Sequence, residues 1–403
     1  MTQRAARTTA LTALLAAAAA ACASPPQESP PAPPRAPAAK PAAKPAASGG
    51  PSAVRGASAG MRAFTLVATG DVLPHSSVIE QARADAGGAG YDFRPMFAGV
   101  KPVISKADLA ICHMETVYGA DGDYTGYPTF KSPPEVAVAL ADTGYDSCST
   151  ASNHTLDDGS EGLRRTLDAL DEAGVKHAGS ARSEAEARQI TMLTAGGAKV
   201  AHLAYTYGTN GLPLPTGRPW AVNLLNDEKI ISDARAARRA GADVVVVSPH
   251  WGQEWQDEPN AQQLRLAKAL TASQTDGRPD IDLIVGTHAH VPQAYEKVNG
   301  SWVAYGLGDQ IAGAMFNHSG AQDPRGNQGT IGRFTFAPPA EPDGRWEVSK
   351  AEFIPQWYDT DAGRVVNVNA AIDDGADHTA LRDRIQRVVM SRGGAKAGLV
   401  MGQ

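Results

Sequence analysis

Short apolar runs that alternate with amphipathic stretches constrain the fold of this chain more than any other feature. Runs that predict strands occupy residues 64–69, 107–112, 145–150, 200–206, 243–249 and 282–287. Between several of them, residues 133–144, 159–174, 226–241 and 260–273 carry apolar residues three or four positions apart and often end in Gly, as helices do. This alternation predicts an α/β protein in which helices cover the sheets.

The second half of the chain has a different pattern. Residues 301–309, 329–337 and 346–358 have the composition of strands without helices between them, which predicts a second, more antiparallel layer. The hydrophobic content of 42% in 403 residues can supply a sizeable core. Because no internal repeat or boundary interrupts residues 61–360, we expect one domain there. A C-terminal extension with one helix, at about 377–392, is expected to follow over residues 361–403.

The first 22 residues have the pattern of an export signal. Arg4 and Arg7 precede an apolar run of Leu and Ala, which is too short to span a membrane permanently and ends in small residues before Cys22. This arrangement resembles a bacterial lipoprotein signal, in which Cys22 would carry the lipid. Ala19 stands where such signals usually have Leu, so secretion with a structurally idle Cys22 is the alternative.

Residues 23–60 predict a disordered linker. They are mainly Pro, Ala, Ser and Gly, with ten of the 28 prolines, and cannot bury enough apolar surface to fold. A Pro-rich tether extends by roughly 3 Å per residue, so this one could reach on the order of 100 Å. We therefore expect an exported protein held at the outer face of the bacterial cell membrane by a lipid on Cys22.

Charge and cysteine content exclude some functions. Residues 1–60 hold six of the 37 Lys and Arg and one of the 43 Asp and Glu, so the remainder has a net charge of −11, which argues against nucleic acid as a partner. The three cysteines form no CxxC pair, which argues against a thiolate zinc site. Cys112 and Cys148 lie near the carboxyl ends of neighbouring predicted strands, where they could form a disulfide or remain two buried thiols.

Polar residues that could carry chemistry follow the predicted strands. They are Asp71, Glu115, Asn153 with His154, His250, His288 and His290. Each alone has a plainer interpretation as a hydrogen-bonded loop residue or a helix cap. Together they are informative, because ligands of open α/β sheets bind at the carboxyl ends of the strands. His288 and His290, two residues apart in extended chain, would point the same way.

The donor set indicates a metal. Carboxylates together with imidazoles suit divalent transition metals such as Mn, Fe or Zn, whereas an all-oxygen set would indicate calcium. The number of donors fits two metal ions that share a bridging carboxylate. A single zinc would need only three or four of them.

Several motifs then resemble one known family. "GD" (70–71), "HME" (113–115), "ASNHTLDDG" (151–159), "HWGQEW" (250–255), "GTHAHVPQ" (286–293) and "YGLGD" (305–309) stand in the order found in the poly-gamma-glutamate capsule-synthesis (CapA) family. The resemblance covers roughly residues 62–312. It implies a layered, metallophosphatase-like sandwich of the calcineurin type.

The resemblance also implies roles for individual residues. Asp71 and His290 would hold one metal, whereas Asn153, His250 and His288 would hold the second. Glu115 would stand where the fold has its second metal-binding Asp, and either Asp71 or Glu115 could bridge. His154 would face the scissile bond as the catalytic residue.

This chain departs from the family pattern at some positions. It has His113-Met114-Glu115 in place of Asn-Leu-Glu, Ser152 in place of the first Asn of Ala-Asn-Asn-His, and Asp309-Gln310 in place of Asn-Phe. His113 could add a metal ligand, but we expect packing or loop roles for His113 and His75.

Two further groups of residues lie beside the motifs. Trp251, Glu254 and Trp255 are candidates to line a substrate cleft, with core packing as the alternative for the Trp rings. Asp157 and Asp158 are expected to cap the following helix.

These features predict an exported, membrane-anchored, metal-dependent hydrolase that acts on a cell-surface polymer or a phosphoester. The alternative is a non-catalytic surface protein that binds or exports an anionic polymer such as poly-gamma-glutamate. A solute-binding lipoprotein would explain the tether but not the series of His and Asn residues.

Overall fold

The computed structural model describes residues 60–341 and 344–403, which belong to one compact unit. The expected signal at 1–22, with Cys22, and all but the last residue of the expected linker at 23–60 lie outside the described residues.

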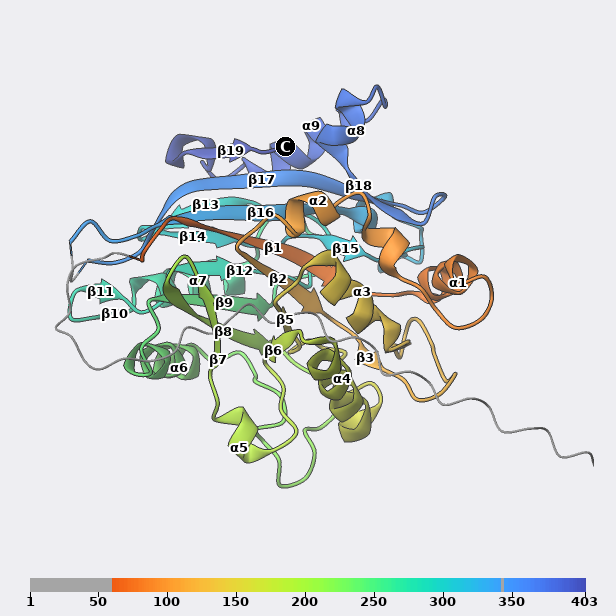
Figure 1. Ribbon diagram of the computed structural model, residues 1–403, viewed down its shortest axis with the longest axis horizontal. Helices are drawn as coiled ribbons and strands as arrows, with labels where there is room; N and C mark the ends of the chain where they lie inside the picture. Colours follow the sequence, from red (N-terminus) through yellow and green to blue (C-terminus); the bar gives the residue numbers. More distant parts are fainter. Residues whose placement is uncertain (1–59, 342–343) are drawn as a thin grey trace, which may run out of the picture. The chain divides into compact units, whose positions relative to one another are not determined.

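The described strands form two large sheets and two short pairs (Figure 1). The first sheet contains β1 (Phe64–Val72), β2 (Leu109–Met114), β5 (Ser147–Ser149), β6 (Lys176–Ala178), β15 (Asp309–Ile311), β16 (Gln328–Ala337), β17 (Glu347–Asp359), β18 (Arg364–Asn367) and β19 (Leu399–Met401). Its order is β18-β17-β16-β1-β2-β5-β6, with β15 beside β1 and β19 beside β17.

The second sheet contains β7 (Thr191–Ala195), β8 (Ala198–Thr206), β9 (Val244–His250), β12 (Leu283–Val285), β13 (Tyr295–Val298) and β14 (Ser301–Ala304). Its order is β13-β14-β12-β9-β8-β7. The short pairs, which the sequence patterns did not predict, join β3 (Val117–Tyr118) to β4 (Lys131–Ser132) and β10 (Gln274–Thr275) to β11 (Arg278–Pro279).

The helices of the described residues are α1 (Ser76–Asp85), α2 (Lys101–Ile104), α3 (Glu135–Thr143), α4 (Gly159–Ala173), α5 (Glu184–Ala187), α6 (Asp227–Arg239), α7 (Ala261–Ala272), α8 (Val368–Asp373) and α9 (Thr379–Val389), with short 3-10 turns η1 (Arg94–Phe97), η2 (Pro324–Asn327) and η3 (Ala395–Ala397). None of these described helices is both long enough and apolar enough to cross a bilayer.

Local sequence signals explain where several helices begin and end. Asn226 and Asn260 precede α6 and α7, and each side chain accepts a hydrogen bond from a backbone N–H of the first turn. Gly144 and Gly174 end α3 and α4 in the left-handed conformation, which glycine adopts without steric cost.

The two sheets pack face to face around a shared apolar core. Phe64, Leu66 and Ala68 of β1 point into this core, where Val200 of β8 and Val244 of β9 meet them from the second sheet. The intervening residues of β1 point the other way, because side chains alternate along a strand. The alternation explains why β1 is buried on both faces.

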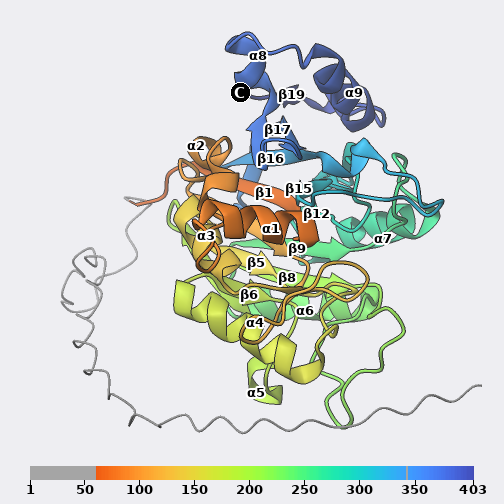
Figure 2. The same cartoon turned by 90° about the vertical axis from the view of Figure 1, so that its right-hand side faces the viewer.

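Helices cover the outer faces of both sheets. Val78 of α1 and Leu140 of α3 pack with Val67 on the outside of the first sheet. Ile230 of α6 and Leu270 of α7 belong to a separate cluster with strands of the second sheet. Figure 2 shows these layers edge-on. The layered α/β sandwich predicted from the sequence is confirmed.

The strands that lead to the predicted site run parallel. β1, β2, β5 and β6 pair in parallel in the first sheet, as do β8, β9, β12 and β14 in the second. β16 and β17 are antiparallel, as their sequence pattern predicted. The parallel strands end on the same side of the molecule in Figure 1, so the residues that follow them can converge.

The C-terminal segment differs from the expected extension with one helix. It contains two helices, α8 and α9, and two strands, β18 and β19, that pair with β17. Ile385 and Val389 of α9 are buried in the core that the two sheets share. Residues 361–403 are therefore part of the same domain.

Cys112 and Cys148 lie directly opposite each other on β2 and β5. Their Cα atoms are 4.4 Å apart, and a disulfide joins them. Of the two alternatives that the sequence left open, the structure has the disulfide.

Candidate metal centre

Strand register places donors from several strands side by side. In the first sheet, Asp71 of β1 pairs with Asp309 of β15 on one side and with His113 of β2 on the other. In the second sheet, His250 of β9 bridges to Thr287, just after β12. These rows lie at the carboxyl ends of the parallel strands, where the sequence predicted a site.

Gly70 allows the close approach on which this arrangement depends. A Cβ atom at this position would lie 1.6 Å from the carbonyl oxygen of Gly308, so any other residue would push the neighbouring segments apart. The backbone N–H of Asp71 donates to that same oxygen at 3.1 Å. Gly70 therefore brings Asp71 and Asp309 together.

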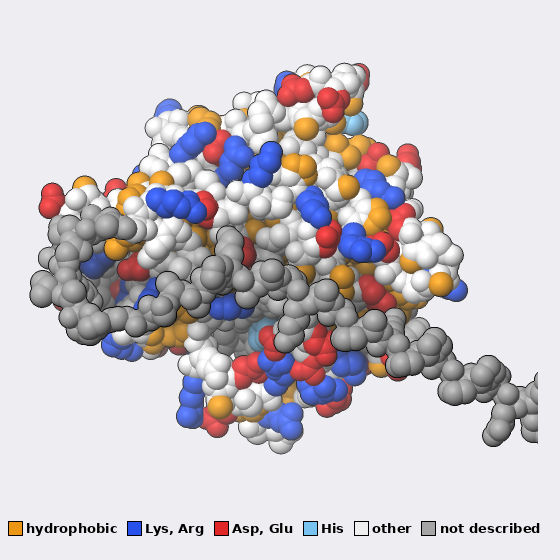
Figure 3. All heavy atoms as spheres, in the orientation of Figure 1, with side chains coloured by type: hydrophobic (Ala, Val, Ile, Leu, Met, Phe, Trp, Pro, Cys, Tyr) orange, Lys and Arg blue, Asp and Glu red, His pale blue; other side chains and the backbone are white. Residues whose placement is uncertain are grey.

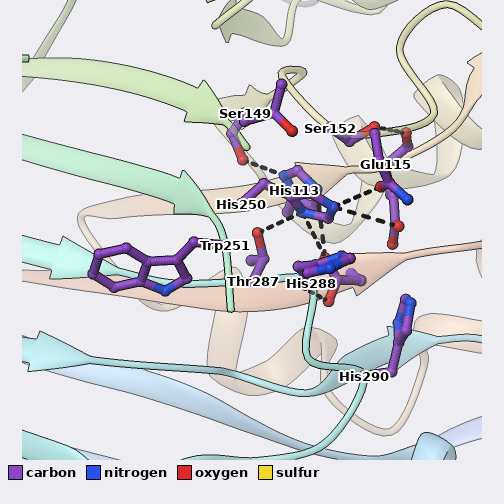
Figure 4. Close-up of polar contacts among 12 residues, drawn as sticks. His113, Glu115, Ser149, Ser152, His250, Trp251, Thr287, His288 and His290 are labelled. Atoms are coloured by element: carbon purple, nitrogen blue, oxygen red, sulfur yellow. Dashed lines mark hydrogen bonds and ion pairs between the residues drawn. The ribbon is translucent and has the colours of Figure 1, made fainter. Parts of the chain in front are cut away.

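The first group of donors joins the two sheets. It consists of Asp71, His113 and His250, all buried, whose ligand atoms lie within 4.8 Å of one another. Asp71 Oδ1 is 3.4 Å from His113 Nε2 and 3.7 Å from His250 Nδ1. Figure 4 shows the rings of His113 and His250 next to each other, with His288 nearby.

Two more groups of donors share His290. One consists of Glu115, His288 and His290, and the other of Asp71, His290 and Asp309.

His288 and His290 have φ angles of 92° and 57°, which are uncommon for residues other than glycine. Such backbone strain persists only where the surroundings impose it, and it gathers at functional sites.

Asn153 reaches the same place from the loop after β5. Its Oδ1 lies 2.8 Å from Nε2 of His250, and its Nδ2 donates to Asn210 at 3.2 Å. The structure thus brings Asn153 beside His250 and Asp71 beside His290, but it groups His288 with Glu115 and His290, and His250 with Asp71, where the sequence had placed His250 and His288 on one metal.

The donors fit a metal because many of their atoms have no partner in the protein. Among the described residues, the buried atoms without a hydrogen bond include Asp71 Oδ1, His113 Nε2, both carboxylate oxygens of Glu115, His288 Nδ1 and Asp309 Oδ2. Burying such groups unpaired costs about 1–3 kcal/mol each, and more for charged groups. Divalent cations would satisfy these atoms together.

The electrostatics of the protein alone support this interpretation for His113 and His250, whereas for His290 burial is outweighed by the carboxylates of Asp309 and Glu115, which raise its pKa. Burial, followed by the charge of Asp309, raises the pKa of Asp71 well above its usual value, and burial with the charge of Asp71 does the same for Glu115. Burial lowers the pKa of His113 to about 3, and burial with neighbouring imidazoles lowers that of His250. Neutral imidazole is the form that binds metals.

His154 lies at the edge of the donors. Its Nδ1 is 2.7 Å from Oδ2 of Asp157, and that oxygen also accepts a hydrogen bond from the backbone N–H of Phe130 at 2.7 Å. Asp157 therefore orients the imidazole of His154, and the expectation that it caps α4 is wrong. Asp158 precedes α4, but its carboxylate pairs with Arg165 and makes no capping hydrogen bond.

A cavity of about 640 Å³ adjoins the donors and is lined in part by His154, His290, Glu254 and Trp255. Glu254 lies at the cleft as expected. Trp251 does not line it, because its ring is fully buried in the core and its indole N–H donates to the carbonyl of Tyr305 at 2.8 Å. In Figure 4 the ring of Trp251 points away from the imidazoles.

Comparison with known families decides the assignment of the chain. The family model described as bacterial capsule synthesis protein PGA_cap matches residues 65–314, which include all the donors. The chain belongs to this family.

Relatives in the capsule-synthesis family match parts of this chain. The capsule biosynthesis protein CapA of Bacillus anthracis is 30% identical over 180 residues, which are 44% of this chain and 42% of that protein. The PGA biosynthesis protein CapA of Bacillus subtilis is 27% identical over 239 residues, 58% of each chain. A probable polyglutamine synthesis accessory protein of Mycobacterium tuberculosis is 26% identical over 216 residues, 51% of this chain and 55% of that one. The chain thus spans about half the length of the curated relatives it matches.

Solved structures of other proteins resemble this capsule-synthesis family member more distantly. A phosphatase from Mycoplasma pneumoniae covers 73% of this chain and 94% of its own, with 14% identity and a TM-score of 0.44. A 5'-nucleotidase precursor from Thermus thermophilus covers 80% of this chain and 60% of its own, with 17% identity and a TM-score of 0.39. Likenesses at this level carry no argument about activity.

Two donors depart from what the sequence predicted of this family member. His113, expected to have a packing or loop role, lies among the donors. Asp309 had no assigned role, and its Oδ1 is 2.9 Å from Nδ1 of His290. Both follow the rule that identified the other donors: His113 stands two residues before Glu115, as His288 stands two before His290, and Asp309 follows an apolar run.

Proposed function

We propose that this chain is an exported, metal-dependent hydrolase that cleaves a bond in a cell-surface polymer during its synthesis or processing. The observation that supports this proposal is the convergence of buried, unpaired carboxylate and imidazole atoms beside an open cavity. A purely structural role would leave those atoms as an unexplained cost to stability.

Two divalent transition metal ions, of Mn, Fe or Zn, would account for the donors. Asp71 belongs to two of the three donor groups and is suited to a bridging position, with His113 and His250 on one side and His290 and Asp309 on the other. Glu115, His288 and Asn153 would complete the set. When bound, such ions act as Lewis acids and lower the pKa of coordinated water.

We propose that His154 acts on the leaving group of the reaction. Asp157 fixes its Nδ1, and the ring lines the cavity without belonging to any donor group. An imidazole in that place can protonate the leaving oxygen or nitrogen, or stabilise developing negative charge. Glu254, on the same cavity, is proposed to contact the substrate.

The export signal expected in residues 1–22 and the membership of a bacterial capsule synthesis family support a place at the cell surface. We propose that lipid on Cys22 holds the domain at the outer face of the membrane and that the linker lets it reach the polymer. The matched relatives carry names of capsule and polyglutamate synthesis. On the face shown in Figure 3, Lys and Arg side chains lie interspersed with Asp and Glu. Nucleic acid is therefore not proposed as a partner.

The experiment that tests this proposal measures turnover with protein purified without chelator. Bis(p-nitrophenyl) phosphate and poly-gamma-glutamate serve as the phosphodiester and amide substrates. We expect metal-dependent turnover of one of them, and a loss of about 10²- to 10⁴-fold in His154→Ala with metal retained. Metal-loaded protein that binds polymer yet turns over neither substrate would instead support the alternative, a non-catalytic protein that binds or exports polymer.

A further inference from the structure

The cavity beside the candidate metal centre has aromatic rings that metal binding and proton transfer do not require. We call the part lined by Tyr127, Phe130, Trp255 and Phe316 the aromatic cleft. Phe130 lies edge-on to His154, with ring centroids 4.8 Å apart, so the aromatic cleft begins at the proposed catalytic residue.

One side of the aromatic cleft extends outwards from Phe130. The ring of Phe130 stands edge-on to His75 at 4.9 Å, and His75 in turn stacks with Tyr127 at 6.5 Å. His75, expected to be a loop residue, directly precedes α1 and connects the buried Phe130 to the exposed Tyr127.

Trp255 forms the other side of the aromatic cleft, and its backbone has a strained conformation. Its φ angle is 67°. Its backbone N–H donates a hydrogen bond at 2.9 Å to the carbonyl oxygen of Ala289, the residue between His288 and His290. Its ring lies 6.2 Å from that of His290. A Cβ atom at Gly326 would lie 2.8 Å from the edge of the Trp255 ring, so this glycine makes room for it. Backbone strain of this kind is most frequent at active and ligand-binding sites.

The mouth of the aromatic cleft exposes apolar surface. Tyr127 is 74% exposed and Phe316 is 58% exposed, whereas Leu73, Phe130 and Met315 form a buried floor. Exposed aromatic rings above a pocket of about 640 Å³, a size typical of small-ligand sites, indicate a binding surface.

The charges around the aromatic cleft argue against a strongly anionic occupant. None of the described residues that line the cavity is Lys or Arg, and Glu254 contributes a carboxylate. A poly-gamma-glutamate chain would bring one carboxylate per residue into this space. His318 also lines the cavity, but it is 61% exposed and lies 3.8 Å from the carboxylate of Glu254, so no Lys or Arg would replace the hydration that those carboxylates lose.

Besides histidines and apolar residues, the cavity is lined by neutral hydrogen-bonding side chains. Ser76, Ser77 and Asn317 offer hydroxyl and amide groups, and Glu254 can accept hydrogen bonds from hydroxyls. Flat apolar ring faces combined with such groups match the chemistry of a sugar ring, which has one C–H-rich face and hydroxyls at its edge. The C–H groups carry slight positive charge and favour the electron-rich face of an aromatic ring.

We propose that the aromatic cleft binds a neutral sugar residue of the substrate, next to the bond that lies at the metal centre. The position of that bond rests on the proposed function, whereas recognition of the sugar does not. The substrate would then be a polymer that contains sugar rather than poly-gamma-glutamate.

The test is equilibrium binding by calorimetry to a panel of neutral hexose and N-acetylhexosamine tetrasaccharides, with tetra-gamma-glutamate and adenosine as competitors of other chemistry. We expect at least one saccharide to bind, and Trp255→Leu to weaken its binding by about tenfold or more. Phe316→Ala should weaken it too. Trp357→Leu is the matched control, because Trp357 lies on β17 against His378, away from the cleft, and it should leave the affinity unchanged.

Sugar recognition is refuted if no saccharide binds at millimolar concentration, or if tetra-gamma-glutamate or adenosine binds more tightly than every saccharide. It is also refuted if Trp255→Leu remains folded by circular dichroism and binds saccharide as tightly as the wild type. The same titrations after removal of metal separate the two proposals. Saccharide binding that survives metal removal supports the aromatic cleft even if hydrolysis is never found, and hydrolysis without saccharide binding would refute the cleft alone.

Discussion

His154 Nδ1 lies 2.7 Å from Oδ2 of Asp157, and the same oxygen accepts the backbone N–H of Phe130. This relationship fixes which ring nitrogen of His154 is available to the cavity. We predict that Asp157→Asn lowers turnover by about 10-fold to 100-fold, less than removal of the imidazole itself, with little change in metal content. Steady-state kinetics and elemental analysis of one preparation check this.

Asp158→Asn is the matched control for Asp157→Asn. Asp158 carries the same group one residue later, but it pairs with Arg165 and does not contact His154. A similar loss of turnover in both variants would mean that the loop, rather than the orientation of His154, governs activity.

His113 is predicted to bind metal, contrary to its expected packing role. Loss of residues that only hydrogen-bond to metal ligands costs roughly 10- to 100-fold in affinity, so His113→Ala should weaken metal binding by more than this. His202→Ala is the control, because His202 is also fully buried on a strand but bonds to Ser147 and Ser248. Competition with a chromogenic chelator measures the metal affinity of the His113 and His202 variants. Equal metal affinity in the His113 variant and the wild type would refute the role.

The disulfide between Cys112 and Cys148 is predicted to stabilise the fold. It closes a loop across a sequence separation of 36 residues, for which chain entropy suggests at most about 4 kcal/mol. The double variant Cys112→Ala with Cys148→Ala should therefore melt at a lower temperature than the wild type under oxidising conditions. Free-thiol titration of unfolded, unreduced protein checks the bond itself, since two reactive thiols besides Cys22 would show that it is absent.

Cys22 is predicted to anchor the protein. Cys22→Ala should move the protein from the membrane fraction to the soluble exported fraction, because the lipid has no other proposed attachment point. Unchanged fractionation would contradict lipidation and favour secretion with an idle cysteine.

The sequence predicted the strands and helices that lead to the site because each is encoded locally. Apolar runs such as 64–69 and 243–249 are buried on both faces, and helices α3 and α4 end at the glycines that marked them. The donors that follow those strands could be named for the same reason. The short strands of the C-terminal segment could not, because pairing with β17 rather than local composition defines them.

Local patterns could mark His113 and Asp309 as candidates, because both follow apolar runs, but could not predict that they meet at Asp71. Each pairs with Asp71 from a different side, and this depends on strand register between segments far apart in the chain. Trp251 shows the converse. It adjoins His250 in sequence, but successive residues at a strand end point in different directions, so one reaches the donors and the other the core.

The metal content of the purified protein shows whether the buried carboxylates and imidazoles form a metal centre. Protein prepared without chelator and dialysed against Mn²⁺ or Zn²⁺ should retain about two ions per chain. Asp71→Asn, which alters a member of two donor groups, should lose most of them. Asp282→Asn, which changes a buried carboxylate paired with Arg238 away from the donors, should retain them. Wild-type protein that holds no metal, or an Asp71 variant that holds as much metal as the wild type, would show that these donors do not form a metal centre.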